Sequence, residues 1–464
     1  MNIIPRKGSK PLRGMTANQK HNKMKYRYLT ILFFLSIQTF AQEKTNETLN
    51  QLVRLAIENS PKIKEQQQTV LMGDYRTKIQ EAALKPIIQS EIGVTRIDPV
   101  AKAQFAFGPT PTSLQFQPNM NYNANIGGNY VIYDWGKQFV NIEKSKLETN
   151  LAKTGVEGLK NVFAYQVASL YYGIIFSQKA IEVQKEQLKL VEDNGKIIAS
   201  RLKQGDALDY DQISIQVRYK NAESRVSDLQ SQLEKQVIYL SSLIGKDAHG
   251  MIPAGIDFNL GTADLSVETA TTQAQTNNYD LKTLKDRDLI AERDVKISQM
   301  STLPILAANA QVGIRNGYLP RINGETPDIA DDFKLNSIVG VKLTIPVYSG
   351  HRGAYQTEIA KLNREMLKYS VDVTNQALKR DLEAAQNDYA TAKNKLELSQ
   401  ENVKQAQYAL NLANVRYKNG VLTNVEIEAA QTALQDAQFT QLQYQYQMSL
   451  AKLEMNRLAG IKFW

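Results

Sequence analysis

Residues 120–137 read MNYNANIGGNYVIYDWGK. Its side chains alternate with a period of two, which predicts a β-strand with one polar and one apolar face. The polar face carries Asn121, Asn123, Asn125 and Asn129, and the other carries Tyr122, Ala124, Ile126, Tyr130 and Ile132. The strand, expected over 120–133, ends at a corner formed by Asp134, Trp135 and Gly136.

Three further segments alternate in the same way, at 87–97, 305–318 and 335–347. Each is about as long as the 9–11 residues that a tilted membrane-spanning strand requires. A half-buried soluble strand would also alternate, but a soluble sheet would need a core to cover its apolar face. The rest of the chain reads as long helices, and the connections 98–118 and 319–334 are polar and rich in proline. The alternation therefore favours strands in a membrane.

The corner occurs twice, because the chain contains an internal repeat. Three segments recur 215 residues further on: 131–137 at 346–352, 201–205 at 416–420, and 240–245 at 455–460. Ala56, Asn59 and Pro86 recur 218 residues later at Ala274, Asn277 and Pro304. Several matches at one spacing indicate a duplication. We expect a leader at 1–41, a first repeat at 42–245, a linker at 246–263 and a second repeat at 264–464. Each repeat would begin with one helix, at 46–85 and at 264–303.

Proline placement predicts the long helices. None of the 13 prolines lies within 119–252 or 347–464, and proline costs about 3 kcal/mol inside a helix. The strong turn signals in these tracts are Gly205 and Gly420, each after cations that suit a helix C-terminus. Two helical hairpins follow, roughly 137–203 with 206–244 and 352–418 with 421–459. Arms of this length reach about 100 Å.

A heptad pattern runs along the second hairpin. Large residues recur every seven positions at Leu382, Tyr389, Leu396, Val403, Leu410 and Tyr417, and mostly small ones at Leu378, Ala385, Ala392, Ser399, Ala406 and Ala413. This is the alternation of a coiled-coil seam. A solvated coiled coil would show the same period, so the pattern alone does not indicate a channel.

The leader carries most of the net charge of +9 and predicts export. Eight of the 56 basic residues lie within 1–28, and the 48 that remain nearly balance the 47 acidic residues. The excess of basic residues lies in the leader and therefore does not indicate a nucleic-acid partner. Lys25 and Arg27 precede the apolar run 29–37, and small residues precede a cleavage site between Ala41 and Gln42, as in a secretory signal peptide. Met24 is the expected start codon, with Met1 and Met15 as alternatives. The alternative to a cleaved signal peptide is a membrane anchor that is retained in the mature protein.

The chain contains no cysteine, which excludes disulfides, thiolate metal sites and a cysteine nucleophile. Its three histidines, His21, His249 and His351, are scattered, so no metal or cofactor site is expected. No set of catalytic residues stands out, and an enzyme is not expected.

Four strands cannot close a membrane barrel, because known barrels begin at about eight strands. An open sheet edge in lipid would leave backbone groups unpaired. The chain must therefore pool strands from several copies, and the residues leave open whether there are two, three or four.

This duplicated arrangement resembles the TolC-type outer-membrane efflux protein (outer membrane factor) family. The resemblance runs from Leu49 to Gly460 and rests on 55–61, the corner 131–136, the tip turns and the closing segments 243–245 and 458–460. It implies an α+β membrane protein in which four strands per protomer join a 12-stranded barrel in a trimer, continued by a periplasmic α-barrel of helical hairpins. It also implies a periplasmic adaptor (membrane fusion) protein and an inner-membrane pump as partners, with 246–263 as an equatorial belt.

The resemblance further suggests a periplasmic gate of acidic residues at Asp211 and Glu426, with Asp209 and Glu428 nearby. Helix capping is the competing interpretation, because Thr423 and Glu426 fit a capping box. Leu422 stands where the family has a basic partner. The docking surface for the adaptor would comprise Gly205, Asp206, Ala207, Leu208, Asn419, Gly420, Val421 and Leu422. The strand-to-helix corners would comprise Asp134, Trp135, Gly136, Ser349 and Gly350.

The predicted function is a passive outer-membrane exit duct of a tripartite efflux or type I secretion system. The alternative is a periplasmic coiled-coil adaptor or structural protein of an envelope complex. The sequence does not predict the cargo.

Overall fold

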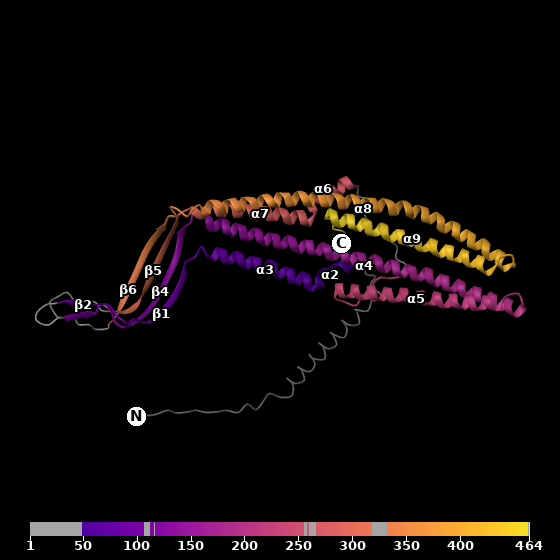
Figure 1. Cartoon of the computed structure of the whole chain (residues 1–464), viewed down its shortest axis with the longest axis horizontal. Coiled ribbons are helices and arrows are strands. Elements are labelled where there is room, and N and C mark those ends of the chain that lie inside the picture. Colours follow the sequence, from indigo (N-terminus) through magenta and orange to yellow (C-terminus); the bar gives the residue numbers. More distant parts are fainter. Residues whose placement is uncertain are drawn as a thin grey trace, which may run out of the picture.

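A four-stranded sheet lies at one end of an elongated molecule and continues into a long bundle of helices in the computed structural model (Figure 1). The structure describes residues 49–105, 112–115, 117–254, 258, 266–317, 332–462 and 464. The predicted leader 1–41, its cleavage site at Ala41 and Gln42, and residues 255–257 and 259–263 of the predicted linker lie outside the described residues. The division of the chain into domains stays a prediction.

The sheet is antiparallel with strand order β1-β4-β5-β6. Its strands are β1 (Ile87–Arg96), β4 (Met120–Tyr133), β5 (Ile305–Gly317) and β6 (Asp332–Thr344). The last strand ends earlier than the expected 347, because Pro346 has no N–H to donate to a ladder. A small hairpin of β2 (Lys102–Phe105) and β3 (Thr112–Gln115) extends the first connection, where the sequence predicted only a loop.

Two antiparallel helical hairpins form the long bundle: α4 (Lys137–Gln204) with α5 (Asp209–Ile244), and α8 (Arg352–Lys418) with α9 (Asn424–Ala459). Both return helices begin three residues later than the expected 206 and 421. The reason is that Leu208 and Thr423, the N-caps, have extended backbones (ψ 151° and 161°).

The leading helix of each repeat is broken into two, whereas the sequence predicted single helices at 46–85 and 264–303. The first is α2 (Leu49–Asn59) and α3 (Pro61–Ala82), and the second is α6 (Val267–Asn277) and α7 (Tyr279–Gln299), followed by the 3₁₀ turn η1 (Met300–Thr302). Pro61 cannot donate a helical hydrogen bond and therefore begins a new helix. Ser60 and Asn278 cap the new helices with their side-chain oxygens.

The bundle has two halves with the same plan. Next to the sheet, neighbouring helices follow the order α3-α4-α7-α8, and towards the hairpin tips the order is α5-α4-α9-α8. The helices α4 and α8 pass through both halves, while α3 gives way to α5 and α7 to α9 (Figure 1). The predicted fold class, an α+β membrane fold with duplicated hairpins and four strands that close a barrel only in an oligomer, is confirmed.

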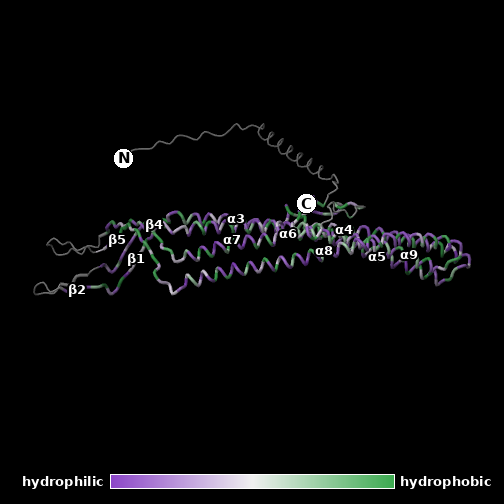
Figure 2. The backbone as a smooth tube through the Cα atoms, turned by 90° about the horizontal axis from the view of Figure 1, so that it is seen from above, coloured by the Kyte–Doolittle hydropathy of each residue, from purple (hydrophilic) through white to green (hydrophobic). Residues whose placement is uncertain are grey.

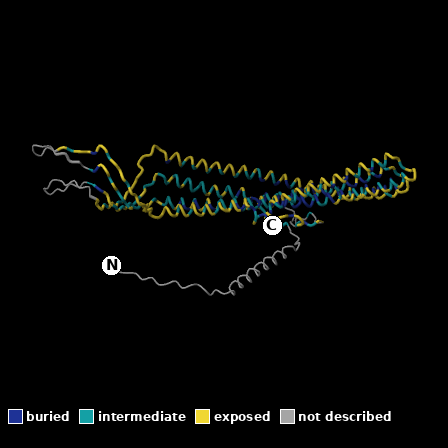
Figure 3. Tube along the Cα trace, turned by 90° about the horizontal axis from the view of Figure 1, so that it is seen from below, coloured by how far each residue is buried: buried dark blue, intermediate teal, exposed yellow. Residues whose placement is uncertain are grey.

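Burial is concentrated where the halves meet and along the hairpins, while the sheet and the adjoining part of α8 are largely exposed (Figure 3). One core joins α2, α4 and α5 around Leu52, Tyr172 and Leu240, and the other joins α6, α8 and α9 around Ala274, Leu382 and Met455. Hydrophilic and hydrophobic residues alternate along the long helices (Figure 2). Among the described residues, no helix has the length and hydropathy to cross a membrane.

Candidate channel wall and periplasmic gate

The register of the sheet places polar side chains in continuous rows across all four strands. One such row runs from Glu91 through Asn125 and Gly313 to Asn336. Asparagine side chains fit over glycines of the neighbouring strand: a Cβ added at Gly93 would lie 2.4 Å from Asn123 Oδ1, and one at Gly340 would lie 3.1 Å from Asn309 Oδ1. This face is suited to line a water-filled lumen.

The opposite face is apolar and uncovered. Ile92 on β1, Leu335 and Val339 on β6 are 80%, 76% and 84% exposed, and Arg96 at the far end of β1 is the one charged side chain that this face carries among the described strand residues. A continuous apolar face of this kind on a soluble sheet would aggregate, so it fits the hydrocarbon of a membrane.

The predicted corner residues do form the two turns from strand to helix. Asp134 accepts hydrogen bonds from the backbone of Gly136 (3.1 Å) and Gln138 (2.8 Å), which fixes the start of α4. Trp135 (φ 60°) and Gly136 (φ 85°) are both left-handed, and so are Gly350 (φ 62°) and His351 (φ 60°) at the second corner, after Ser349. Left-handed backbone is costly for tryptophan and histidine, so both corners hold a strained turn of the same shape.

The predicted tip residues lie in the two turns at the end of the bundle farthest from the sheet. Gly205 (φ 79°) and Gly420 (φ 73°) adopt the left-handed conformation that closes a helix without a steric penalty. Asp206, Ala207 and Leu208 complete the first turn, and Asn419, Val421 and Leu422 complete the second. Leu208 and Val421 are 69% and 73% exposed, so each tip presents an apolar side chain to its surroundings.

The four acidic gate candidates have different surroundings. Asp211 Oδ2 accepts the Leu208 N–H at 3.2 Å, and Glu426 Oε2 accepts the N–H and the hydroxyl of Thr423, both at 2.8 Å. The Thr423 N–H keeps the pKa of Glu426 below its ordinary value. These two acids cap helices, whichever other role they have. Asp209 is an exposed residue at the first position of α5.

Glu428 belongs to a contact between the two hairpins that sequence reasoning missed. Its Oε1 lies 2.6 Å from Arg218 Nη1 of α5 and 2.9 Å from Asn424 Nδ2, and the two charged side chains are only 24% and 17% exposed. Asn424 in turn accepts a hydrogen bond from Asn194 of α4 at 3.0 Å. Helices α4, α5 and α9 are therefore held together within about three turns of their ends at the tips.

A second unpredicted contact lies closer to the tips. The Arg201 guanidinium of α4 donates to the Tyr417 carbonyl of α8 and lies 4.4 Å from the centre of the Tyr417 ring. Tyr417 is buried. Arg201 was expected only to suit a helix C-terminus, and no periodicity in the sequence pairs it with Tyr417.

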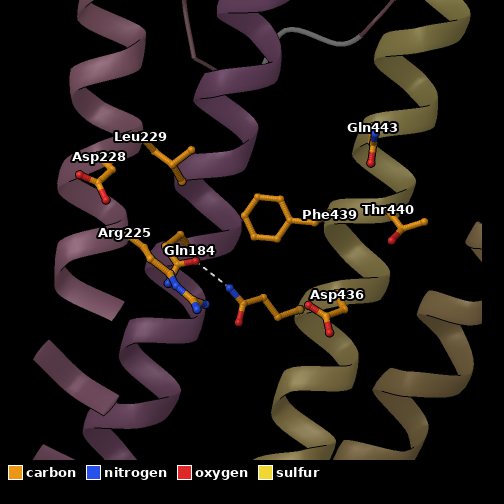
Figure 4. Close-up of a pocket in the computed structure, with 9 residues that line it drawn as sticks. Gln184, Arg225, Asp228, Leu229, Asp436, Phe439, Thr440 and Gln443 are labelled. Atoms are coloured by element: carbon orange, nitrogen blue, oxygen red, sulfur yellow. Dashed lines mark hydrogen bonds between the residues drawn. The ribbon is translucent and has the colours of Figure 1, made fainter. Parts of the chain in front are cut away.

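The seam between the hairpins is also polar further from the tips. Gln435 of α9 donates to Gln184 of α4 at 2.6 Å, and both amides are buried. This pair lies in an open groove of about 490 Å³ between α5 and α9, where Phe439 of α9 extends towards Leu229 of α5 (Figure 4). By contrast, the contact within the first hairpin is apolar, with Val191, Ile198 and Ile215.

The described part of the linker is fixed on the bundle. Ala248 N–H donates to Ser241 Oγ at 2.9 Å, and Gln178 donates to the Ile252 carbonyl at 3.0 Å. His249 contacts Asp247 through one ring nitrogen and Glu234 of α5 through the other, and both carboxylates raise the pKa of the imidazole. Within the described residues, no group of three or more acidic or histidine side chains could hold a metal ion.

Comparison with known proteins gives a family and a fold. The family described as outer membrane efflux protein matches residues 52–246 and 266–461. Comparison with curated proteins finds no significant match.

Solved structures of outer membrane channels share the fold at low sequence identity. VceC of Vibrio cholerae is 16% identical, covers 90% of this chain and 97% of its own, and has a TM-score of 0.71. CmeC of Campylobacter jejuni is 15% identical over 91% and 87%, with a TM-score of 0.68. MtrE of Neisseria gonorrhoeae, solved in an open state, is 14% identical over 89% of each chain, with a TM-score of 0.67.

Proposed function

Because the chain belongs to the outer membrane efflux protein family, we propose that three copies form a passive exit duct that is gated at its periplasmic tips. The family places the chain in the outer membrane as an efflux channel and not as an enzyme. The proposal adds the number of copies, the gate, and the partners: a periplasmic adaptor and an inner-membrane pump of a tripartite efflux or type I secretion system.

One observation carries the proposal: the sheet and the bundle are open at matching edges. Among the described elements, β1 and β6 are the edge strands of the sheet, and α3 and α8, which adjoin them, are the outer helices of the bundle next to the sheet. Lipid cannot satisfy the backbone groups of an open edge. If β6 of one copy pairs with β1 of the next, α8 of the first copy meets α3 of the second, so one operation closes both layers. Three copies then give a barrel of twelve strands, four from each.

The free helices carry apolar stripes that such closure would cover. On α8 the stripe follows a spacing of four and three, with every side chain at least 52% exposed, and comprises Tyr355, Ile359, Leu362, Met366, Tyr369 and Val373. The facing stripe on α3 comprises Leu71, Met72, Tyr75 and Ile79. Exposed stripes at this spacing are typical of helices that pack against a partner.

The tip half repeats the arrangement with different helices. There α5 and α8 are the free helices, and both are apolar on an exposed stripe. The stripe on α5 comprises Tyr210, Ile213 and Val217, and that on α8 comprises Tyr408, Leu412 and Val415. The same helix α8 would thus meet α3 of the next copy near the membrane and α5 of that copy near the tips.

The gate would be held shut by the contacts between the hairpins. Arg201 with Tyr417 and Arg218 with Glu428 join α4 and α5 to α8 and α9 close to the tips. Opening would require the second hairpin to move away from the first, which would break both contacts. The acids Asp211 and Glu426 would line the narrow end.

The exposed tip side chains Leu208 and Val421 suit the adaptor-docking role, because exposed apolar surface on a protein marks a site of contact with a partner. Val425, the second residue of α9, is also 70% exposed and extends this surface.

The test is the mass of the protein extracted from outer membranes in mild detergent, measured by light scattering with the bound detergent subtracted. A trimer that conducts ions in planar bilayers is the expected result. A protein that stays soluble and monomeric without detergent would overturn the duct and favour the coiled-coil adaptor instead.

A further inference from the structure

Two cations face each other across the polar face of the sheet. Arg315 on β5 and Lys334 on β6 are directly opposed in the register, and both are exposed. Directly opposed side chains have Cβ atoms about 4.5–5.5 Å apart, and like charges at this separation destabilise a sheet. The pair lies near the end of the sheet that is farthest from the helices, which is the external end if the helices lie in the periplasm.

Neither Arg315 nor Lys334 has an acidic residue directly opposite it in the register. Neither forms an ion pair with a carboxylate that the structure describes. Of the acidic residues on this face, Glu91 lies on β1, across β4 from β5, and Asp332, two positions before Lys334, is opposite Gly317. Asn123, which is opposite Arg315 on β4, leans away from it, because its Oδ1 lies over Gly93 of β1. Within their own row of the sheet, the two cations therefore face each other without a neutralising partner.

The backbone at this level is firmly held. Asn316, the residue after Arg315, is 5% exposed. Its side chain accepts the Tyr122 N–H at 2.7 Å and donates to the Met120 carbonyl at 2.8 Å, which fastens the beginning of β4 to β5. The clamp therefore fixes β5, and with it the backbone of Arg315, against β4 at this level of the sheet.

We propose that Arg315 and Lys334 form a ring of cations at the external mouth of the duct and that this ring draws anionic solutes outward. This inference rests on the proposed trimer, in which three such pairs would surround the lumen. Rings of arginine and lysine side chains select anions in pores, and the field of the ring reaches about 8–10 Å from the wall at ordinary ionic strength. The apolar face carries no comparable cluster, so the ligand is a solute in the lumen and not a lipid headgroup.

The ring can be tested by current block with inorganic tripolyphosphate. Trimers in a planar bilayer are held at low salt, and tripolyphosphate is added to one side and then to the other. Asp211→Asn with Glu426→Ser is present throughout, so that the acidic tips do not dominate the selectivity. We expect block from the side of the β-barrel mouth, and Arg315→Gln with Lys334→Gln should weaken it about tenfold, the lower end of the local enrichment that a charged cleft produces.

Arg96→Gln is the matched control, because it removes a cation at a similar level of the sheet but on the lipid-facing side. It should leave both the block and the anion-to-cation permeability ratio unchanged. Equal block in the double variant and in Arg96→Gln would overturn the ring. A protein that forms no conducting trimer would instead overturn the proposed function, so the two failures are distinguishable.

Discussion

Asn278 joins the end of α9 to the start of α7. Its Nδ2 donates to the Leu458 carbonyl at 2.9 Å, while its Oδ1 accepts the N–H groups of Asp280 (2.9 Å) and Leu281 (3.2 Å). In the first repeat two residues divide these tasks: Asn59 Nδ2 donates to the Ile244 carbonyl at 2.8 Å, and Ser60 Oγ caps α3. The joint between the two halves of the bundle is therefore built the same way in both repeats.

Asn278→Ala should lower the stability of the purified protein by about 2–3 kcal/mol, because it removes a helix cap and leaves a buried carbonyl unpaired. Thermal unfolding of the detergent-solubilised protein measures the effect. Asn278→Ser keeps a side-chain oxygen that can cap α7, as Ser60 caps α3, and loses the donor to Leu458, so it should cost clearly less. Equal losses in the two variants would show that the cap contributes nothing.

Asp211→Asn with Glu426→Ser should raise single-channel conductance if these acids line the closed tips. Both also cap helices, so the helical starts will loosen, and hydrogen exchange at 209–215 and 424–430 measures that part separately. Asp209→Asn, which removes a nearby charge without a capping bond among the described contacts, is the comparison. Faster exchange with unchanged conductance and unchanged cation selectivity would leave the acids as caps only.

Arg218→Ala should make the channel open more often, because it leaves the carboxylate of Glu428 without its partner across the hairpin seam. A largely buried ion pair of this kind contributes about 1–2 kcal/mol. The open probability in planar bilayers is the measurement. Lys220→Ala, which breaks the exposed pair with Glu223 on the same helix, should have no effect. If both variants behave alike, the Arg218 contact does not hold the gate.

Met366→Asp should prevent trimer formation, because a carboxylate would be placed at the centre of the α8 stripe that the next copy covers. Light scattering in mild detergent gives the mass. Lys361→Asp introduces the same side chain on another exposed face of α8 and disturbs only a surface pair with Glu358. A trimer that survives Met366→Asp and Lys361→Asp equally well would place the interface elsewhere.

The attachment of segment 246–254 should weaken as the pH rises. The pKa of His249 is raised in the folded chain, first by Asp247 and then by Glu234. The protonated ring therefore stabilises the fold fully below about pH 6.5, the ordinary value, and this contribution disappears as the pH passes the raised value. Tryptic cleavage after Lys246, relative to a peptide of the same sequence, should accelerate over that range. His249→Gln should remove the pH dependence but not the cleavage itself.

Much of the fold could be predicted because proline, glycine and period-two alternation act locally. The absence of proline from residues 347–464 predicts α8 and α9, and the alternation of polar and apolar residues over 121–129 predicts β4. The break before Pro61 was missed although proline is a local marker of a helix start. The break at Asn278 has no such marker and depends on contact with the end of a distant helix, at Leu458. Periodicity does not show such a contact.

The features of the candidate site also differ in whether a local sequence signature marks them. Tip turns and corners were found from Gly205, Gly420 and Gly136, since a left-handed backbone has a sequence signature. The pairing of Arg218 with Glu428 could not be predicted from the sequence, because it depends on how far each helix is rotated about its own axis. Arg315 opposite Lys334 depends likewise on the register of β5 and β6, which a shift of one residue would change.

The continuity of α4 and α8 has a mechanical consequence. Every other helix in the described part of the chain stops at the middle of the bundle. Among these helices, a load applied to the tips can therefore reach the sheet along unbroken backbone only through α4 and α8. Each of these two helices is joined to the sheet by one strained turn, α4 at Trp135–Gly136 and α8 at Gly350–His351. If a partner pulled on the periplasmic end, the force would therefore act at the membrane as a torque on the two strand-to-helix turns of each copy.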